Sequence, residues 1–111
     1  MAQGALLSEV PVFPSPMSVN NFRIGDAVAG TLAGRRVALL RAHGSVVVGN
    51  DVLQATVLAI YLESNAERQV RAAMVGEAYV FSAEQVHAFQ EALEKRGLFE
   101  KCWHYYAENL L

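Results

Sequence analysis

His43 is the residue whose type and position could do chemistry. It lies between two short apolar runs, 37–40 (VALL) and 45–48 (SVVV), and Gly44 follows it directly. Both runs are rich in β-branched residues and bounded by turn residues, which predicts two strands joined by a tight bend. A histidine at a strand end can project from a rigid frame, although a lone imidazole among apolar residues is more often a hydrogen-bonded core or turn residue. The residues alone leave both interpretations open.

The other reactive side chains give weaker signals. Cys102 is the only cysteine and has no obvious histidine base, so we interpret it as a packing residue. His87 and His104 lie in predicted helices and are interpreted as surface or packing residues. The chain has no glycine-rich phosphate loop and no G-x-S-x-G motif. His43 therefore remains the principal candidate site residue.

Composition limits the kinds of protein this chain can be. Its 111 residues suffice for one domain at most. Apolar residues make up 53% and charged residues 18%. This apolar fraction is higher than a free-standing small domain needs. We infer that other subunits or a missing segment cover part of the apolar surface. The net charge of −2, without a basic run, argues against nucleic acid and anionic membranes as partners.

Several features favour a cytoplasmic protein. A single cysteine forms no internal disulfide and fits a reducing compartment. The first ten residues have no basic start and no sustained apolar core, unlike a signal peptide. No stretch reaches 18 uninterrupted apolar residues, so we expect no membrane span.

The elements that must position His43 can be predicted from turn and capping residues. Residues 9–16 contain all three prolines and predict an extended edge segment or connector. Residues 21–33 predict an amphipathic helix that Gly34 ends. Asn50 or Asp51 can cap a long helix that runs to about residue 75, before Gly76. The first half of this helix is apolar nearly all round and the second half is charged on one face, which indicates burial at one end only.

Two further helices are predicted after a brief extended link at 79–81. Ser82 and Gln85 form a capping-box pattern that opens a helix to about residue 96, closed by Gly97. The last segment, LFEKCWHYYAENLL, is rich in aromatic residues and predicts a short helix docked on a neighbouring surface.

These residues together resemble a known family. The run VALLRAHGSVVVGNDVLQATVLAIYLESNAERQVRAAMVGE, residues 37–77, resembles the C-terminal part of class II aldolase/adducin proteins. In that family a strand ends in a histidine-glycine pair, a second strand follows, and a long helix packs behind them. The tail CWHYYAENL is similar to the Trp-x-Tyr-Tyr ending of some members. The resemblance covers roughly residues 10–108.

The resemblance implies a fold and a metal site. The fold is α/β, and residues 1–111 would form a single partial domain, the C-terminal half of a three-layer α/β/α domain with a mixed, largely antiparallel sheet. The family's enzymes hold a divalent metal, often zinc, through three histidines, and His43 matches the third. Such a metal keeps an open position for substrate oxygens and stabilises an enediolate. The other two ligands form a His-x-His on a strand, with an acid/base glutamate upstream, and this sequence contains no His-x-His.

The resemblance therefore implies a function that this chain does not complete alone. We expect the C-terminal part of a metal-dependent lyase that cleaves a carbon-carbon bond, by aldol cleavage or decarboxylation, in a small hydroxylated carbonyl or carboxylate compound. A companion N-terminal segment would supply the missing ligands, and the isolated chain would be inactive. The alternatives are a non-catalytic adducin-type structural module and a remnant that folds poorly. Family enzymes are commonly tetramers, so we expect a homo-oligomer in which Tyr105 and Tyr106 contact substrate in a neighbouring chain.

Overall fold

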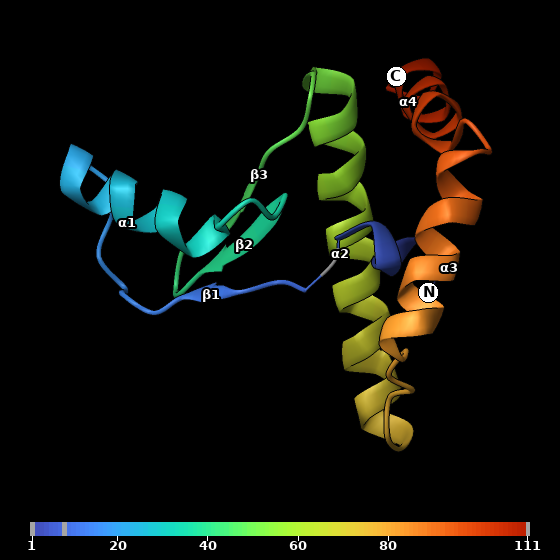
Figure 1. The fold of residues 1–111 in the computed structure, drawn as a ribbon, viewed down its shortest axis with the longest axis horizontal. Helices are drawn as coiled ribbons and strands as arrows, with labels where there is room; N and C mark the ends of the chain where they lie inside the picture. Colours follow the sequence, from blue (N-terminus) through green and yellow to red (C-terminus); the bar gives the residue numbers. More distant parts are fainter. Residues whose placement is uncertain (1, 8, 111) are drawn as a thin grey trace.

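The computed structural model describes residues 2–7 and 9–110, which form a small sheet and a set of helices (Figure 1). In chain order the elements are the 3-10 helix η1 (Ala2–Leu7), strand β1 (Val12–Phe13), helix α1 (Phe22–Leu32), strands β2 (Val37–Leu40) and β3 (Gly44–Val47), and helices α2 (Val52–Val75), α3 (Ala83–Glu94) and α4 (Leu98–Glu108). The fold class is mixed α/β, as the sequence predicts.

The strands form a mixed sheet in the order β1-β2-β3. β1 runs parallel to β2, and α1 is the crossover that a parallel pair requires. β2 and β3 form an antiparallel hairpin in which Leu40 pairs with Gly44. The segment 9–16 was predicted to be an extended edge segment or connector, and its residues 12–13 form the edge strand β1 of the described sheet. The Pro11 carbonyl accepts a hydrogen bond from the backbone N–H of Leu39. β3 begins one residue before the predicted position because Gly44 closes the hairpin ladder.

Helix α1 has the predicted ends but buries less of its apolar face than its spacing suggests. The Asn21 side chain accepts a hydrogen bond from the backbone N–H of Ile24 at 3.0 Å and caps the first turn. α1 contacts β1 and β2, yet Val28 is its one buried residue and Phe22 is 92% exposed. Apolar periodicity predicts a face, but burial also requires a partner surface, and β1 is only two residues long.

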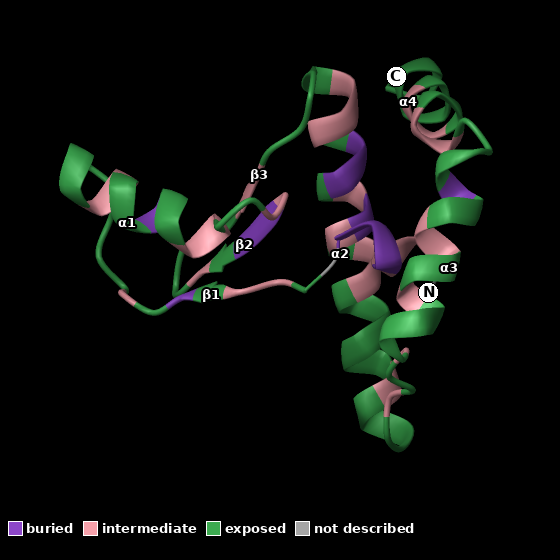
Figure 2. Cartoon of the chain, viewed as in Figure 1, coloured by how far each residue is buried: buried purple, intermediate pink, exposed green. Residues whose placement is uncertain are grey.

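Helix α2 begins and ends where the sequence predicts. Asp51 caps it through the backbone N–H of Gln54 at 2.7 Å, and Gly76 follows its last turn. Val57, Leu58 and Tyr61 are buried in its first half. Figure 2 shows that the last turns of α2 and the link to α3 are almost entirely exposed. The prediction that this helix is buried at one end only is confirmed.

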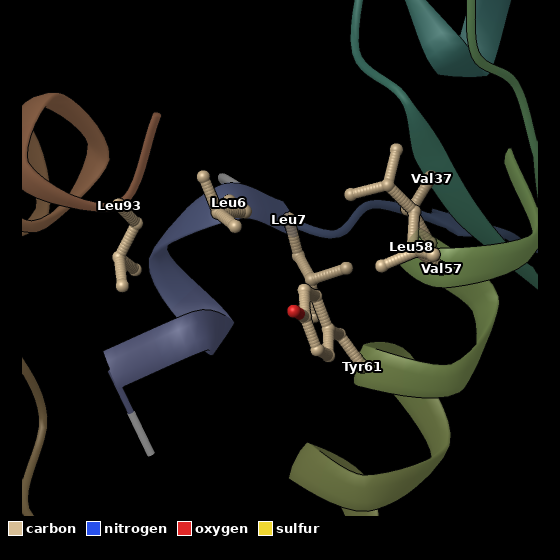
Figure 3. Close-up of a cluster of buried hydrophobic side chains, with 7 residues drawn as sticks. All are labelled: Leu6, Leu7, Val37, Val57, Leu58, Tyr61 and Leu93. Carbon is tan, nitrogen blue, oxygen red and sulfur yellow. The ribbon is translucent and has the colours of Figure 1, made fainter. Parts of the chain in front are cut away.

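The core joins the sheet to α2 directly and reaches α3 through η1. Leu6 and Leu7 of η1 lie between Leu93 of α3 and the buried side chains of α2, as Figure 3 shows. η1 contacts both α2 and α3. The η1 segment therefore packs between α2 and α3 and fixes the position of α3 relative to α2.

The last two helices also follow the sequence pattern. Ser82 and Gln85 form the predicted capping box at the start of α3, with both reciprocal hydrogen bonds present. α4 packs against α2, and Phe99, Cys102 and Trp103 lie against the core from one side of the helix. The prediction that the aromatic segment docks on a neighbouring surface is confirmed.

Candidate metal centre

The β2–β3 hairpin presents His43 at its tip. The His43 backbone N–H donates to the Leu40 carbonyl at 3.0 Å and closes a tight turn. Ala42 takes a φ of 64° and Gly44 a φ of 110°, both in the left-handed region. The Arg41 N–H donates to the Phe13 carbonyl of β1 at 3.2 Å. The tip is thus held by backbone hydrogen bonds to both β1 and β2.

The imidazole of His43 is exposed, and within the described residues it has one hydrogen-bond partner. Its Nε2 donates to the carbonyl oxygen of Pro16 at 2.7 Å. Because a carbonyl only accepts, the neutral ring then carries its hydrogen on Nε2 and keeps a lone pair on Nδ1. Metal-binding histidines commonly donate their second ring N–H to a backbone carbonyl in this way. Nδ1 is therefore the ring nitrogen whose lone pair is left for a metal, whereas binding through Nε2 would require the Pro16 carbonyl to move away.

The structure does not gather other metal ligands around His43. His87 lies exposed on α3 and His104 exposed on α4, in agreement with their interpretation as surface residues. Among residues 2–7 and 9–110, no three His, Cys, Asp or Glu side chains are close enough to hold a metal ion together. The described residues therefore offer one imidazole, whereas a catalytic zinc site takes three protein ligands.

The tyrosines proposed as substrate contacts lie away from the hairpin tip. Tyr105 and Tyr106 are exposed on α4, with their rings edge to face at a centroid separation of 5.1 Å. In Figure 1, α4 and the β2–β3 hairpin tip are at opposite sides of the molecule. One chain does not bring these tyrosines to His43, which leaves a neighbouring chain as the route by which they could reach a site.

Cys102 sits beside Tyr61 at the contact between α4 and α2. Burial raises the pKa of the Cys102 thiol above its usual range, although the Tyr61 hydroxyl acts in the opposite direction. Burial, together with the neighbouring Cys102, raises the pKa of Tyr61 to about 12. A thiol that is harder to ionise is a poorer nucleophile. These observations agree with the interpretation of Cys102 as a packing residue.

A separate open groove of about 850 Å³ lies between α2 and α3, and residues of η1 line one end of it. Arg68 and Gln69 line it from α2, and His87 and Gln90 line it from α3. The Gln90 side chain also donates a hydrogen bond to the Ala5 carbonyl at 2.8 Å, which links α3 to η1 at that end of the groove. The groove shares no lining residue with the hairpin tip.

Sequence reasoning predicted His43 as a site residue but missed the groups that hold it. The Pro16 carbonyl is a backbone atom 27 residues away in the chain, and no side-chain pattern marks it. The Ala42 conformation was also missed, because alanine gives no signal for the left-handed region that glycine usually occupies. The proline cluster at 11–16 is the one feature that could have suggested a rigid segment beside the tip.

Comparison with known protein families agrees with the resemblance seen in the sequence. The family model described as "Class II Aldolase and Adducin N-terminal domain" matches residues 1–70, which include His43 and the whole sheet. The chain belongs to this family. Comparisons with curated proteins and with solved structures found no match. Among the described residues, no helix has both the length and the apolar character that a membrane crossing requires.

Proposed function

We propose that this chain is the C-terminal part of a divalent-metal-dependent lyase of the class II aldolase type. Its reaction would be carbon-carbon cleavage, by aldol cleavage or decarboxylation, in a small hydroxylated carbonyl or carboxylate compound. The observation that carries the proposal is an exposed His43 at a backbone-anchored hairpin tip, inside the segment that matches the family. A cytoplasmic location belongs to the proposal, because the single cysteine fits a reducing compartment.

The metal in this proposal is zinc, with His43 as one of three histidine ligands. The chain's other histidines, His87 and His104, do not join His43, so the residues present do not complete a site. The remaining ligands are proposed to come from a companion segment that carries the family's His-x-His and glutamate. When bound, the cation would supply positive charge against the negative charge that develops on substrate oxygens. The isolated chain should therefore be inactive.

The open edges of the sheet agree with a larger domain. Within the described residues, β3 pairs only with β2, and β1 pairs only with β2. Unpaired strand edges are commonly covered or extended in native proteins. We propose that further strands extend this sheet into the mixed, largely antiparallel sheet of a three-layer α/β/α domain.

A homo-oligomer, proposed as a tetramer, would cover the exposed apolar surface. Large hydrophobic side chains are exposed at the end of α2 and in the link after it, namely Val70, Met74, Val75, Tyr79 and Val80. Such surface on a small domain is typical of an interface. In the tetramer, Tyr105 and Tyr106 of one chain would approach the site of another. Analytical ultracentrifugation of the purified chain should show an oligomer, and a clean monomer would contradict this part of the proposal.

A complementation assay tests the reaction. A class II aldolase truncated before its own strand-turn-strand segment supplies the missing ligands, and the 111-residue chain is added to it. Carbon-carbon cleavage of hydroxylated carbonyl and carboxylate compounds should appear only in the mixture. The His43→Ala variant should lower the rate to background, and the matched His87→Ala variant should leave it unchanged. Full activity with His43→Ala would refute the proposed role of this residue.

The alternative is a non-catalytic structural or oligomerisation module of the adducin type. The observation that favours it is the exposed apolar surface at the end of α2 and beside the open groove, which suits protein contacts. This alternative predicts a stable oligomer and no turnover in the complementation assay with any companion segment. Since both candidates predict oligomers, the turnover measurement separates them.

A further inference from the structure

The chain's charge is divided between the two parts of the molecule. Residues 10–50, which contain the sheet and α1, carry four arginines and one aspartate, a net charge of +3. Residues 51–111, which contain the three C-terminal helices, carry nine carboxylates and five basic side chains, a net charge of −4. The overall value of −2 conceals this division. A field of one sign around a site raises the local concentration of ligands of the opposite charge.

Arg41 brings part of this positive charge to the hairpin tip. It is exposed and lies two residues before His43 in the same turn. The ion pairs recorded within residues 2–7 and 9–110 join Arg35 to Glu9 and Arg71 to Glu67, so the Arg41 guanidinium has no acidic partner there. Its backbone is fixed by the 3.2 Å hydrogen bond to Phe13.

Two other arginines of this region, Arg23 and Arg36, also form no ion pair with the part of the chain that the structure describes, but neither shares these features. Arg23 lies on α1, and Arg36 precedes β2 at the far end of the hairpin from the tip. Arg41 alone combines a place in the His43 turn with a backbone hydrogen bond to the β1 strand.

We propose that Arg41 binds an oxyanion group of the substrate, a carboxylate or a phosphate, beside the His43 site. This inference rests on the proposed function and assigns a specificity-determining residue to it. The planar guanidinium presents paired N–H donors that match two oxygens of a carboxylate or phosphate. A substrate held through its oxyanion at Arg41 would have its adjacent hydroxyl or carbonyl oxygens near the turn that carries His43.

The test is anion binding to the 111-residue chain, followed by NMR at constant ionic strength. Inorganic phosphate and malonate are titrated separately into ¹⁵N-labelled protein, and the amides of residues 41–44 and the arginine side-chain Nε–Hε signals are followed. Three proteins are compared, namely the unaltered chain, Arg41→Gln and the matched control Arg23→Gln. Constant ionic strength removes the general screening effect of the added salt.

We expect the tip signals of the unaltered chain to shift, and Arg41→Gln to bind about fivefold more weakly, the effect of one exposed ion pair. Arg23→Gln should bind like the unaltered chain. Stronger binding of malonate or of phosphate identifies which oxyanion the site prefers. Equal weakening by both variants, or no shift at the tip, would overturn the proposal, because the attraction would then be general or absent.

The complementation assay distinguishes a failure of the Arg41 proposal from a failure of the proposed lyase function. In the active mixture, Arg41→Gln should lower kcat/KM for an anionic substrate about 10- to 100-fold, as expected for a lost charge-assisted hydrogen-bond pair, with the zinc content unchanged. Turnover that is indifferent to Arg41→Gln would refute the role of Arg41 and leave the lyase standing. Anion binding at Arg41 without turnover in any mixture would refute the lyase and leave the anion site standing.

Discussion

At the scale of single residues, the hairpin tip combines an exposed imidazole with a strained backbone. Ala42 has a φ of 64°, a region in which an L-residue with a Cβ is less stable than glycine. Strained positions of this kind persist only where surrounding contacts determine them, and they are concentrated at functional sites. Here the surrounding contacts are the hydrogen bonds of Arg41 to Phe13 and of His43 to Leu40.

Replacing Ala42 with glycine should relieve this strain. We expect the free energy of unfolding to rise by about 0.5–1 kcal/mol, because glycine adopts positive φ freely and this gain exceeds its larger entropy in the unfolded chain. Urea denaturation followed by circular dichroism measures the change. The control Ala29→Gly, within α1, should lower the same quantity by about 1 kcal/mol. A decrease for Ala42→Gly of the same size as for the control would show that the turn is not strained.

The sequence predicted the position of His43 between two strands, whereas the hydrogen-bond partner of its ring could not be predicted. Strand, histidine, glycine and strand follow one another in the sequence, so the hairpin can be read locally. The contact of Nε2 with the Pro16 carbonyl depends on how the segment after β1 passes the tip, which is a tertiary arrangement. Arg41 was missed for a similar reason, since an arginine in a turn is ordinary until the structure of residues 2–7 and 9–110 shows no acidic partner for it.

At the scale of elements, capping residues predicted the helices better than apolar spacing did. Asp51 and Gly76 mark the two ends of α2, and Ser82 with Gln85 marks the start of α3. A cap satisfies backbone groups locally, so it needs no distant partner. The apolar spacing predicted an amphipathic helix over 21–33, but Phe22 on this helix is exposed. The η1 helix was not predicted, since six residues carry no usable period and its burial depends on α2 and α3.

The contact between α2 and α4 predicts a pH dependence of its own. The folded-state pKa of Tyr61, about 12, lies above its ordinary value of 10.0, so folding favours the neutral phenol. This contribution to stability is fully present below pH 10 and is lost as the pH rises through about 12. Absorbance at 295 nm should therefore show one of the four tyrosines ionising late, and Tyr61→Phe should remove that late step.

Tyr79→Phe is the matched control, because Tyr79 is 75% exposed. It should leave the late step in place. The account of this contact would be wrong if Tyr61→Phe left the late step unchanged.

At the scale of the whole molecule, a single core connects the sheet to the C-terminal helices. Val37 of β2 meets Val57 and Leu58 of α2, and Leu7 of η1 extends this contact toward α3. The remaining half of α2 and the link after it stay outside the core. The composition predicted exposed apolar surface, because 53% of the residues are apolar and a core of this size cannot bury them all.

Two valines of α2 test which end of the helix belongs to the core. Both are replaced by alanine, so the two variants make the same change in intrinsic helix propensity. Val57 is fully buried and Val75 is 90% exposed. Val57→Ala should lower the free energy of unfolding by about 1.5–3 kcal/mol through lost burial and the cavity it leaves, whereas Val75→Ala should change it by less than about 0.5 kcal/mol. Chemical denaturation compares the two variants. Equal effects would mean that the two ends of α2 are alike in packing, contrary to the structure.

The most direct test of the central claim is the zinc content of the complementation mixture, measured by elemental analysis after gel filtration. The account predicts about one zinc ion per complete site in the mixture with the unaltered chain. It predicts the same content with His87→Ala and a loss of most of the metal with His43→Ala. Undiminished zinc with His43→Ala would contradict the claim that this imidazole completes a metal centre.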